Sequence, residues 1–170
     1  MLFRSLFETS VYENRRKVLK EKIKSGLILL MGNEEAGMNY KDNWYPFRQD
    51  SCFLYYFGIN LSGLAAIIDA ESGEETVFGN ELSIEDIVWT GPQSTVVEMA
   101  AAVGVSKTAV YTAIETVIRK AITSGRQIHF IPPYRAENKI KIAQWLNIAV
   151  HAVDDAASIP LIKADRKAHV

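Results

Sequence analysis

The residue types best suited to chemistry gather in residues 45–51 (YPFRQDS), which lead into an aromatic run. Arg48 is a fixed cation whose planar guanidinium presents a fork of donors. It stands beside Gln49 and Asp50, and the aromatic run supplies Tyr56. Two interpretations of Arg48 stay open. Its side chain anchors the next element by binding loop carbonyls, or it belongs to a recognition surface, since interface cores are enriched in Arg, Tyr and Trp.

A second stretch, residues 86–92 (DIVWTGP), places Trp89 directly ahead of Thr-Gly-Pro. This sequence predicts that the tryptophan lies on a turn and not in the middle of a core element. Its ring either fills a gap in its own domain or reaches a partner surface. Neither stretch holds a complete set of nucleophile, base and orienting group, so we interpret both as contact loops.

The remaining reactive residue types do not form a recognisable metal, nucleophile or phosphate site. The chain has three histidines, His129, His151 and His169, and no two of them share a helical spacing that would suit a metal. Asp154-Asp155 lies close to His151, and we interpret it as the solvated cap of a final helix. Cys52 has no nearby histidine and is interpreted as a small buried hydrophobe. Neither a G-x-S-x-G elbow nor a glycine-rich phosphate loop occurs, so no self-contained active site is predicted.

Composition narrows the class of protein. The 170 residues are 48% hydrophobic, which is enough for a core and excludes intrinsic disorder. The net charge of −1 is far from the basic field that nucleic-acid or anionic-membrane binders need. One cysteine excludes an internal disulfide framework and a cysteine-based zinc site. The longest apolar stretch, residues 27–31, is too short to span a bilayer, and the first residues lack the pattern of a secretory signal. We therefore expect a single cytoplasmic domain.

Hydrophobic periodicity predicts the elements that position these loops. Ser10 and Glu13 have the spacing of a capping box at the start of a surface helix. Two strands joined by a tight turn predict an antiparallel hairpin at 64–70 and 75–78. The order of elements predicts an α/β fold with a mixed sheet. The full set comprises helices at 11–25, 96–103, from Ser106 towards Gly125, and at 135–147, and strands at 27–31, 53–59, 64–70, 75–78, 127–131 and 149–153, with a loop at 33–43.

Three segments carry a resemblance to a known family. They are Arg15-Arg16-x-x-Leu19, then Tyr45-x-Phe47-Arg48-Gln49-Asp50-Ser51-x-Phe53-x-Tyr55-x-x-Gly58, then Asp86-Ile87-Val88-Trp89-x-Gly91. Together they resemble the N-terminal domain of the aminopeptidase P, prolidase and creatinase family. The middle segment is long and specific for that domain. The resemblance runs over most of residues 10–163 and is strong as far as Gly91.

The resemblance implies the domain organisation. Residues 1–163 are expected to form the N-terminal domain, with a ribonuclease-H-like mixed sheet of five to six strands and flanking helices. Residues 164–170 are expected to start a linker or form a tail. They depart from the Arg-x-x-Lys-[ST] sequence expected at that point, which leaves open the boundary and the possibility of a naturally short homologue.

The resemblance also implies where catalysis takes place. In the family, a C-terminal pita-bread domain holds two Asp, one His and two Glu that bind two divalent metal ions, usually manganese. These metals activate a water to attack the amide bond before proline. No position in this chain matches those five ligands, so no catalytic or metal-binding residue is assigned here, and the segment alone is expected to be inactive.

The role that the resemblance implies for this domain is to build an oligomer, a dimer or tetramer, and to restrict access to the active site. Its expected partners are its own C-terminal catalytic domain, further copies of the chain and short proline-containing peptides, with no nucleic acid and no membrane. The residues expected at the access route or interface are Arg48, Gln49, Asp50, Tyr56 and Trp89.

Two alternatives stay open: a catalytically inactive homologue that binds peptide or protein segments, and a creatinase-like hydrolase. The metal ligands of the parent protein would decide between them.

Overall fold

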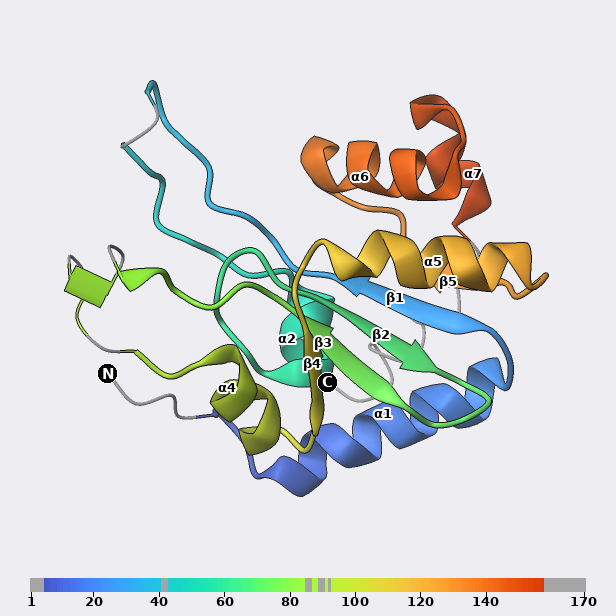
Figure 1. Cartoon of the computed structure of the whole chain (residues 1–170), viewed down its shortest axis with the longest axis horizontal. Coiled ribbons are helices and arrows are strands. Elements are labelled where there is room, and N and C mark those ends of the chain that lie inside the picture. Colours follow the sequence, from blue (N-terminus) through green and yellow to red (C-terminus); the bar gives the residue numbers. More distant parts are fainter. Residues whose placement is uncertain (1–4, 41–42, 85–86, 89–90, 92, 158–170) are drawn as a thin grey trace.

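A computed structural model describes residues 5–40, 43–84, 87–88, 91 and 93–157 (Figure 1). In chain order the elements are α1 (Thr9–Ile23), β1 (Leu27–Met31), α2 (Ser51–Phe57), β2 (Ala65–Asp69), β3 (Glu75–Phe78), α4 (Val96–Ala102), β4 (Lys107–Ala109), α5 (Ala113–Thr123), β5 (Ile128–Phe130), α6 (Ala136–Leu146), the 3-10 turn η1 (Val150–Ala152) and α7 (Val153–Ala156).

The five strands form one mixed sheet in the order β4-β3-β2-β1-β5. β1 pairs antiparallel with β2, and β2 pairs antiparallel with β3, which confirms the predicted hairpin. β4 lies parallel to β3, and β5 lies parallel to β1. The predicted α/β fold with a mixed sheet is therefore confirmed.

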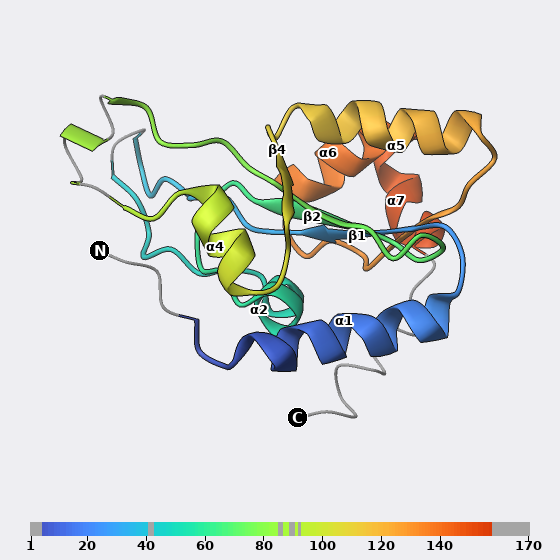
Figure 2. The ribbon, with the colours of Figure 1, turned by 60° about the horizontal axis from the view of Figure 1, so that its bottom comes forward.

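Helices cover both faces of this sheet. In Figure 2, α1, α2 and α4 lie on one face, and α5, α6 and α7 lie on the other. β1 shows how the sequence accommodates two cores, because successive side chains of a strand point to opposite faces. Its Ile28 and Leu30 pack with the α1/α2/α4 side, and its Leu27 and Leu29 pack with the α5/α6 side. A strand buried on both faces is continuously apolar, as its sequence LILLM is.

The aromatic run is a helix, so the strand predicted at 53–59 is wrong. Residues Ser51–Phe57 form α2, whose Phe53, Tyr56 and Phe57 are fully buried. These positions follow the i, i+3, i+4 spacing of one helix face. Gly58 ends the helix at φ +65, a left-handed conformation that glycine adopts without steric cost. Aromatic residues favour strands in general. Here the buried side chains all lie on one face at helical spacing, so a helix buries them and a strand would not.

Three other predictions are corrected. Residues Lys107–Ala109 form the edge strand β4, and the next helix begins only at Ala113, not near Ser106. The strand predicted at 149–153 is instead η1 and α7, which pack on α6. α1 begins at Thr9 with Glu8 as its N-cap and no side-chain cap, so the capping box is wrong.

Candidate functional site

The predicted contact loop begins with a buried glutamine. Gln49 is only 4% exposed. Its Oε1 accepts hydrogen bonds from the backbone N–H of Asn33 at 2.6 Å and of Asp50 at 2.9 Å. Its Nε2 donates to the carbonyl of Leu61 at 2.7 Å and to that of Ile59 at 3.4 Å. One side chain therefore joins the segment after β1 to the segment that leads into β2.

Asp50 and Tyr56 are also built into the fold. The Asp50 carboxylate caps α2, because its Oδ1 accepts from the N–H groups of Cys52 at 2.8 Å and Phe53 at 3.0 Å. Tyr56 is fully buried, and its carbonyl accepts a hydrogen bond from Arg16. Gln49, Asp50 and Tyr56 are thus each held within the fold, and their predicted part in substrate access stays a prediction.

Arg48 is placed differently from its neighbours. Its side chain is exposed, and its backbone carbonyl accepts from Asn33 Nδ2 at 2.9 Å. Its guanidinium is therefore available for a partner, as the recognition interpretation requires. Trp89, the other main candidate, lies outside the described residues, as does Asp86.

Two extended segments leave the same end of the sheet as these residues (Figures 1 and 2). We call residues 33–48 the first arm and residues 79–95 the second arm; parts of both arms lie outside the described residues. The first arm folds back on itself, with Gly37 bridged to Trp44 and the Met38 N–H donating to the Asn43 carbonyl at 2.7 Å.

Large apolar side chains on both arms face solvent. Ile84 is 84% exposed and Val88 73% exposed on the second arm, and Tyr40 is 63% exposed on the first arm. The remaining large exposed apolar residues of the arms are Met38, Trp44, Tyr45, Leu82 and Ile87. Large contiguous apolar patches on protein surfaces are characteristic of interaction sites.

One residue that the sequence reasoning did not single out as functional is central to the packing. Arg16 is fully buried. Its guanidinium donates to Glu75 Oε2 at 2.7 Å, to the Tyr56 carbonyl at 2.9 Å and to the Val103 carbonyl at 2.8 Å. A buried charge is tolerated only when it is paired and hydrogen-bonded in this way. In the sequence, the Arg15-Arg16 pair in the first segment of the resemblance was the feature that could have pointed to Arg16.

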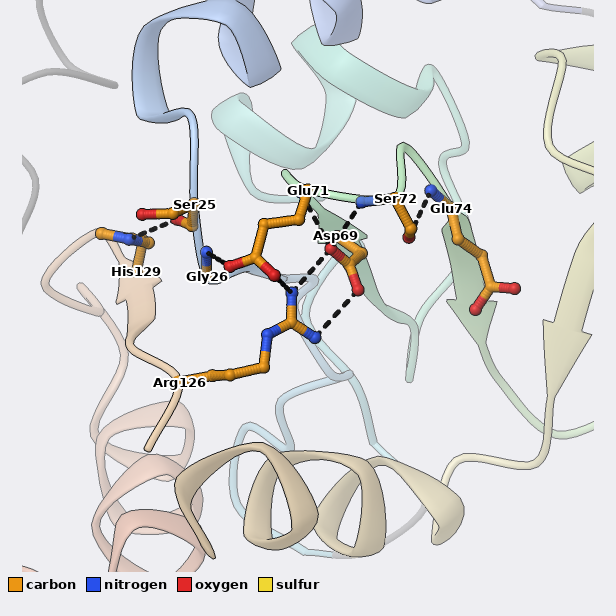
Figure 3. Close-up of polar contacts among 8 residues, drawn as sticks. All are labelled: Ser25, Gly26, Asp69, Glu71, Ser72, Glu74, Arg126 and His129. Carbon is orange, nitrogen blue, oxygen red and sulfur yellow. Dashed lines mark hydrogen bonds and ion pairs between the residues drawn. The ribbon is translucent and has the colours of Figure 1, made fainter. Parts of the chain in front are cut away.

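The far end of the sheet is closed by charged side chains (Figure 3). Arg126 binds the Asp69 carboxylate through two nitrogens, at 2.7 and 2.9 Å, and Glu71 at 3.2 Å. The hydrogen bond from Arg126 lowers the pKa of Asp69 to about 2, from an ordinary value of 3.8. The same pairing raises the pKa of Arg126. Glu71 also accepts from the Gly26 N–H at 3.0 Å, which holds the start of β1 to this cluster.

The histidine at this end has a structural position. The His129 ring lies with Nε2 3.0 Å from the Ser25 carbonyl oxygen, and burial lowers the pKa of its ring. Among the residues that the structure describes, no cluster of three or more His, Cys, Asp or Glu side chains could hold a metal ion. In the same part of the chain, no helix has the length and apolar character needed to cross a membrane.

Comparison with known proteins identifies relatives of this domain. Residues 12–129 match the family model described as "Aminopeptidase P, N-terminal domain". A probable Xaa-Pro aminopeptidase of Fusarium vanettenii is 31% identical over 77 residues, which are 44% of this chain and 16% of that protein. The Xaa-Pro dipeptidase of Homo sapiens is 32% identical over 65 residues, which are 38% of this chain and 13% of that protein.

Solved structures share the fold. Aminopeptidase P from E. coli, in its low-pH form, superposes with a TM-score of 0.70 at 19% identity. Proline aminopeptidase P II from Yersinia pestis gives a TM-score of 0.70 at 18% identity. The matches cover 84% and 83% of this chain but only 33% of each of those chains. This chain therefore spans about a third of the length of the proteins whose fold it shares.

Proposed function

The chain belongs to the family of aminopeptidase P N-terminal domains, and on this basis we propose that it is the non-catalytic domain of a Xaa-Pro metallopeptidase. Its role in that enzyme is to assemble the oligomer and to restrict entry to the active site. The relatives named as Xaa-Pro aminopeptidase and Xaa-Pro dipeptidase support the activity of the whole protein.

The observation that carries the proposed role is the pair of arms. Both arms extend from one end of the sheet and expose large apolar side chains, such as Tyr40 and Ile84. An unpartnered surface of this kind is suited to pack on a second subunit or on another domain. Arg48 lies at the base of the first arm, where its exposed guanidinium can bind a carboxylate or a carbonyl of the partner.

Arms that border the active site would select peptide substrates by their length. A narrow opening excludes peptides that are too long, and it removes water from those that enter, which strengthens electrostatic interactions in the active site. In this proposal, neither Arg48 nor any other described residue transfers a proton in the reaction. Their contribution is to exclusion and to binding.

The proposed chemistry belongs to a domain outside this chain. Two divalent metal ions, which we expect to be manganese, supply the activated water there. The described residues offer no cluster that fits such a pair of ions, so no residue of this chain is assigned to them.

The experiment that tests the proposal compares two proteins. The gene is first read past Val170, and the product of the complete reading frame is assayed with Xaa-Pro dipeptides and longer Xaa-Pro peptides, with and without Mn²⁺. We expect metal-dependent hydrolysis before proline by the complete product and none by residues 1–170 alone. Hydrolysis by the isolated segment, with host proteases excluded, would overturn the division of roles. A complete product without the five metal ligands or activity would favour the inactive binding homologue.

A further inference from the structure

An apolar pocket lies between the sheet and α5. Its volume is about 350 Å³, within the size range of small-molecule sites. Side chains of β1, β2, β3 and β4 form its floor, and one side of α5 forms its roof (Figure 2). The proposed peptidase role gives this space no part, so its lining decides what it can hold.

The strand register fixes the arrangement of the floor. Thr76 of β3 lies between Ile67 of β2 and Lys107 of β4. Two residues further along β3, Phe78 lies beside Ala109 of β4. Alternate residues of a strand point to the same face of a sheet. Both of these rows therefore face α5.

Small side chains keep the space open. Ala109 of β4 and Ala113 and Ala121 of α5 all border the pocket, and each contributes only a methyl group. Protein interiors are otherwise closely packed, with few voids larger than a water molecule. The gap between α5 and this part of the sheet is thus large enough for the hydrocarbon body of a ligand.

Thr76 is the strongest sign of a ligand, since the side chain is only 7% exposed. Among the described residues its hydroxyl has no hydrogen-bond partner, and its oxygen is not one of the side-chain atoms sealed from water. Because β3 lies inside the sheet, between β2 and β4, the hydroxyl opens into the pocket that Thr76 lines. Buried hydroxyl groups are normally hydrogen-bonded, and a ligand in the pocket would supply the partner.

The charges around the pocket leave one cation over. Lys107 pairs with Glu74 at 2.7 Å, and Arg126 pairs with Asp69 at 2.7 Å (Figure 3 shows the second pair). Lys120 also lines the pocket, and its ammonium group has no ion-pair partner in the described part of the chain. Charge complementarity therefore favours a ligand with a single negative charge.

The course of α5 brings Lys120 over the floor. The start of the helix lies beside the end of β3, because the Tyr111 N–H donates to Asn80 Oδ1 at 3.1 Å. Its other end lies beside the start of β3, because Arg126 binds the carboxylate at the end of β2, the antiparallel neighbour of β3. Lys120 lies between these ends and borders the same pocket as Thr76.

We propose that this pocket binds a small apolar monocarboxylate. The carboxylate accepts a hydrogen bond from the Thr76 hydroxyl and pairs with the Lys120 ammonium group, since both groups are donors. The hydrocarbon body packs on Phe78, Ala109 and the half-buried side of Val117. This inference stands on the pocket alone and does not depend on the proposed peptidase role.

The first part of the test measures binding of octanoate to the 170-residue chain by calorimetry and NMR titration. A ligand of so few atoms is expected to bind with a dissociation constant on the order of 1 mM. Octanamide has the same body without the charge and should bind about tenfold more weakly. Acetate has the charge without the body and should bind at least about tenfold more weakly, because it buries little apolar surface.

The second part uses variants that keep the fold. Thr76→Val removes the hydroxyl and retains a β-branched side chain suited to a strand, and Lys120→Gln removes the exposed charge. Each should weaken octanoate binding about tenfold.

Each variant has a matched control on the other face of the sheet. Thr108 is paired in register with Val77, whose side chain packs on the α1 side, so Thr108→Val changes a threonine that points away from the pocket. Lys17→Gln changes an exposed lysine of α1. Both controls should bind octanoate as the wild-type chain does, and thermal unfolding checks that all four variants are folded.

Three results would overturn the proposal. They are the absence of octanoate binding at about 10 mM, binding of octanamide as tight as that of octanoate, and equal binding of octanoate by the wild-type chain, Thr76→Val and Lys120→Gln.

Discussion

At one end of the sheet Arg126 pairs with Asp69 at 2.7 Å and with Glu71 at 3.2 Å, whereas at the other end the arms hold Tyr40 and Ile84 out in solvent. The first end, which we call the closed end, pairs its charges within the chain, although Arg126 Nε is buried without a hydrogen-bond partner among the described residues. The second, the open end, exposes large apolar side chains on its arms. Ion pairs within the chain hold the closed end, whereas the open end presents the surface to which the proposed function assigns a partner.

The largest effect is expected from a glycine at the closed end. Gly26 has φ +85, and an added Cβ would lie 2.5 Å from the Gln127 carbonyl oxygen. Gly26→Ala therefore combines backbone strain with a clash against another backbone, and we expect it to lower the free energy of unfolding by about 3 kcal/mol. Urea unfolding measures the change.

The matched control for this glycine lies at the open end. Gly63 has a similar φ of +69, and no atom lies within 4 Å of its added Cβ. Gly63→Ala should therefore cost only the backbone strain, about 1 kcal/mol. Equal costs at the two glycines would show that the close packing around Gly26 does not contribute.

The next effect concerns Gln49, the buried support of the open end. Gln49→Leu removes the partners of two backbone N–H groups and of the Leu61 carbonyl. We expect a loss of about 2 kcal/mol in the free energy of unfolding, because buried donors and acceptors are left unpaired. Gln144→Leu on the exposed face of α6 is the control and should change stability by about 0.5 kcal/mol or less. A similar small change for Gln49→Leu would contradict its structural role.

A pH-dependent effect on stability at acid pH is expected at the closed end. The pKa of Asp69 is about 2 in the folded chain, against an ordinary value of 3.8. Because the folded-state value is lower, the ionised group stabilises the fold above about pH 4, and this contribution is lost as the pH falls from about 4 to about 2. Partial exposure screens the pair, so we expect Asp69→Asn to cost about 1 to 2 kcal/mol at pH 7.

The measurement is the difference in unfolding free energy between the wild-type chain and Asp69→Asn from pH 2 to pH 7. The difference should shrink towards the acid limit of this range. A difference that stays constant with pH would assign the effect to shape and not to the charge of Asp69.

The smallest effect on stability is expected on the arms, where the effect on association is the informative one. Ile84→Ser should change the free energy of unfolding by about 0.5 kcal/mol or less, because the side chain is 84% exposed. If the arms form an interface, the same change weakens self-association about tenfold, as for other interface anchors. Sedimentation velocity over a range of concentrations measures it. Ile122→Ser, at a 41% exposed site near the end of α5, is the control, and an equal effect of both variants would contradict an interface at the arms.

The sequence predicted those parts of the fold in which neighbouring residues carry the signal. The run LILLM at 27–31 and the hairpin at 64–78 have local patterns, and the structure confirms both. The strand predicted at 53–59 was wrong because the aromatic composition of this run favours a strand. The spacing of its buried residues also fits one face of a helix, and the structure has α2 there. β4 was missed because three residues, Lys107–Ala109, are too few to show a period.

The candidate site was predicted in part. The stretch around Arg48 was singled out by residue type, and it does lie at the base of an exposed arm. The inward positions of Gln49 and Asp50 could not be predicted, because their partners are backbone groups that the fold brings close. The buried Asn138 carried no signal in the sequence, because its hydrogen bond to the Gly32 carbonyl forms only once the chain has folded.

The sequence by itself determined that this chain is an α/β domain of one family, because side-chain periodicity and a long motif are local properties of the chain. Only the tertiary structure decided which charges are satisfied and which surfaces are not. Asp69 and Arg126 are 57 residues apart, and Asn138 bonds to a carbonyl 106 residues away. Hydrogen bonds and ion pairs act over a few ångströms in space, whatever the separation along the chain.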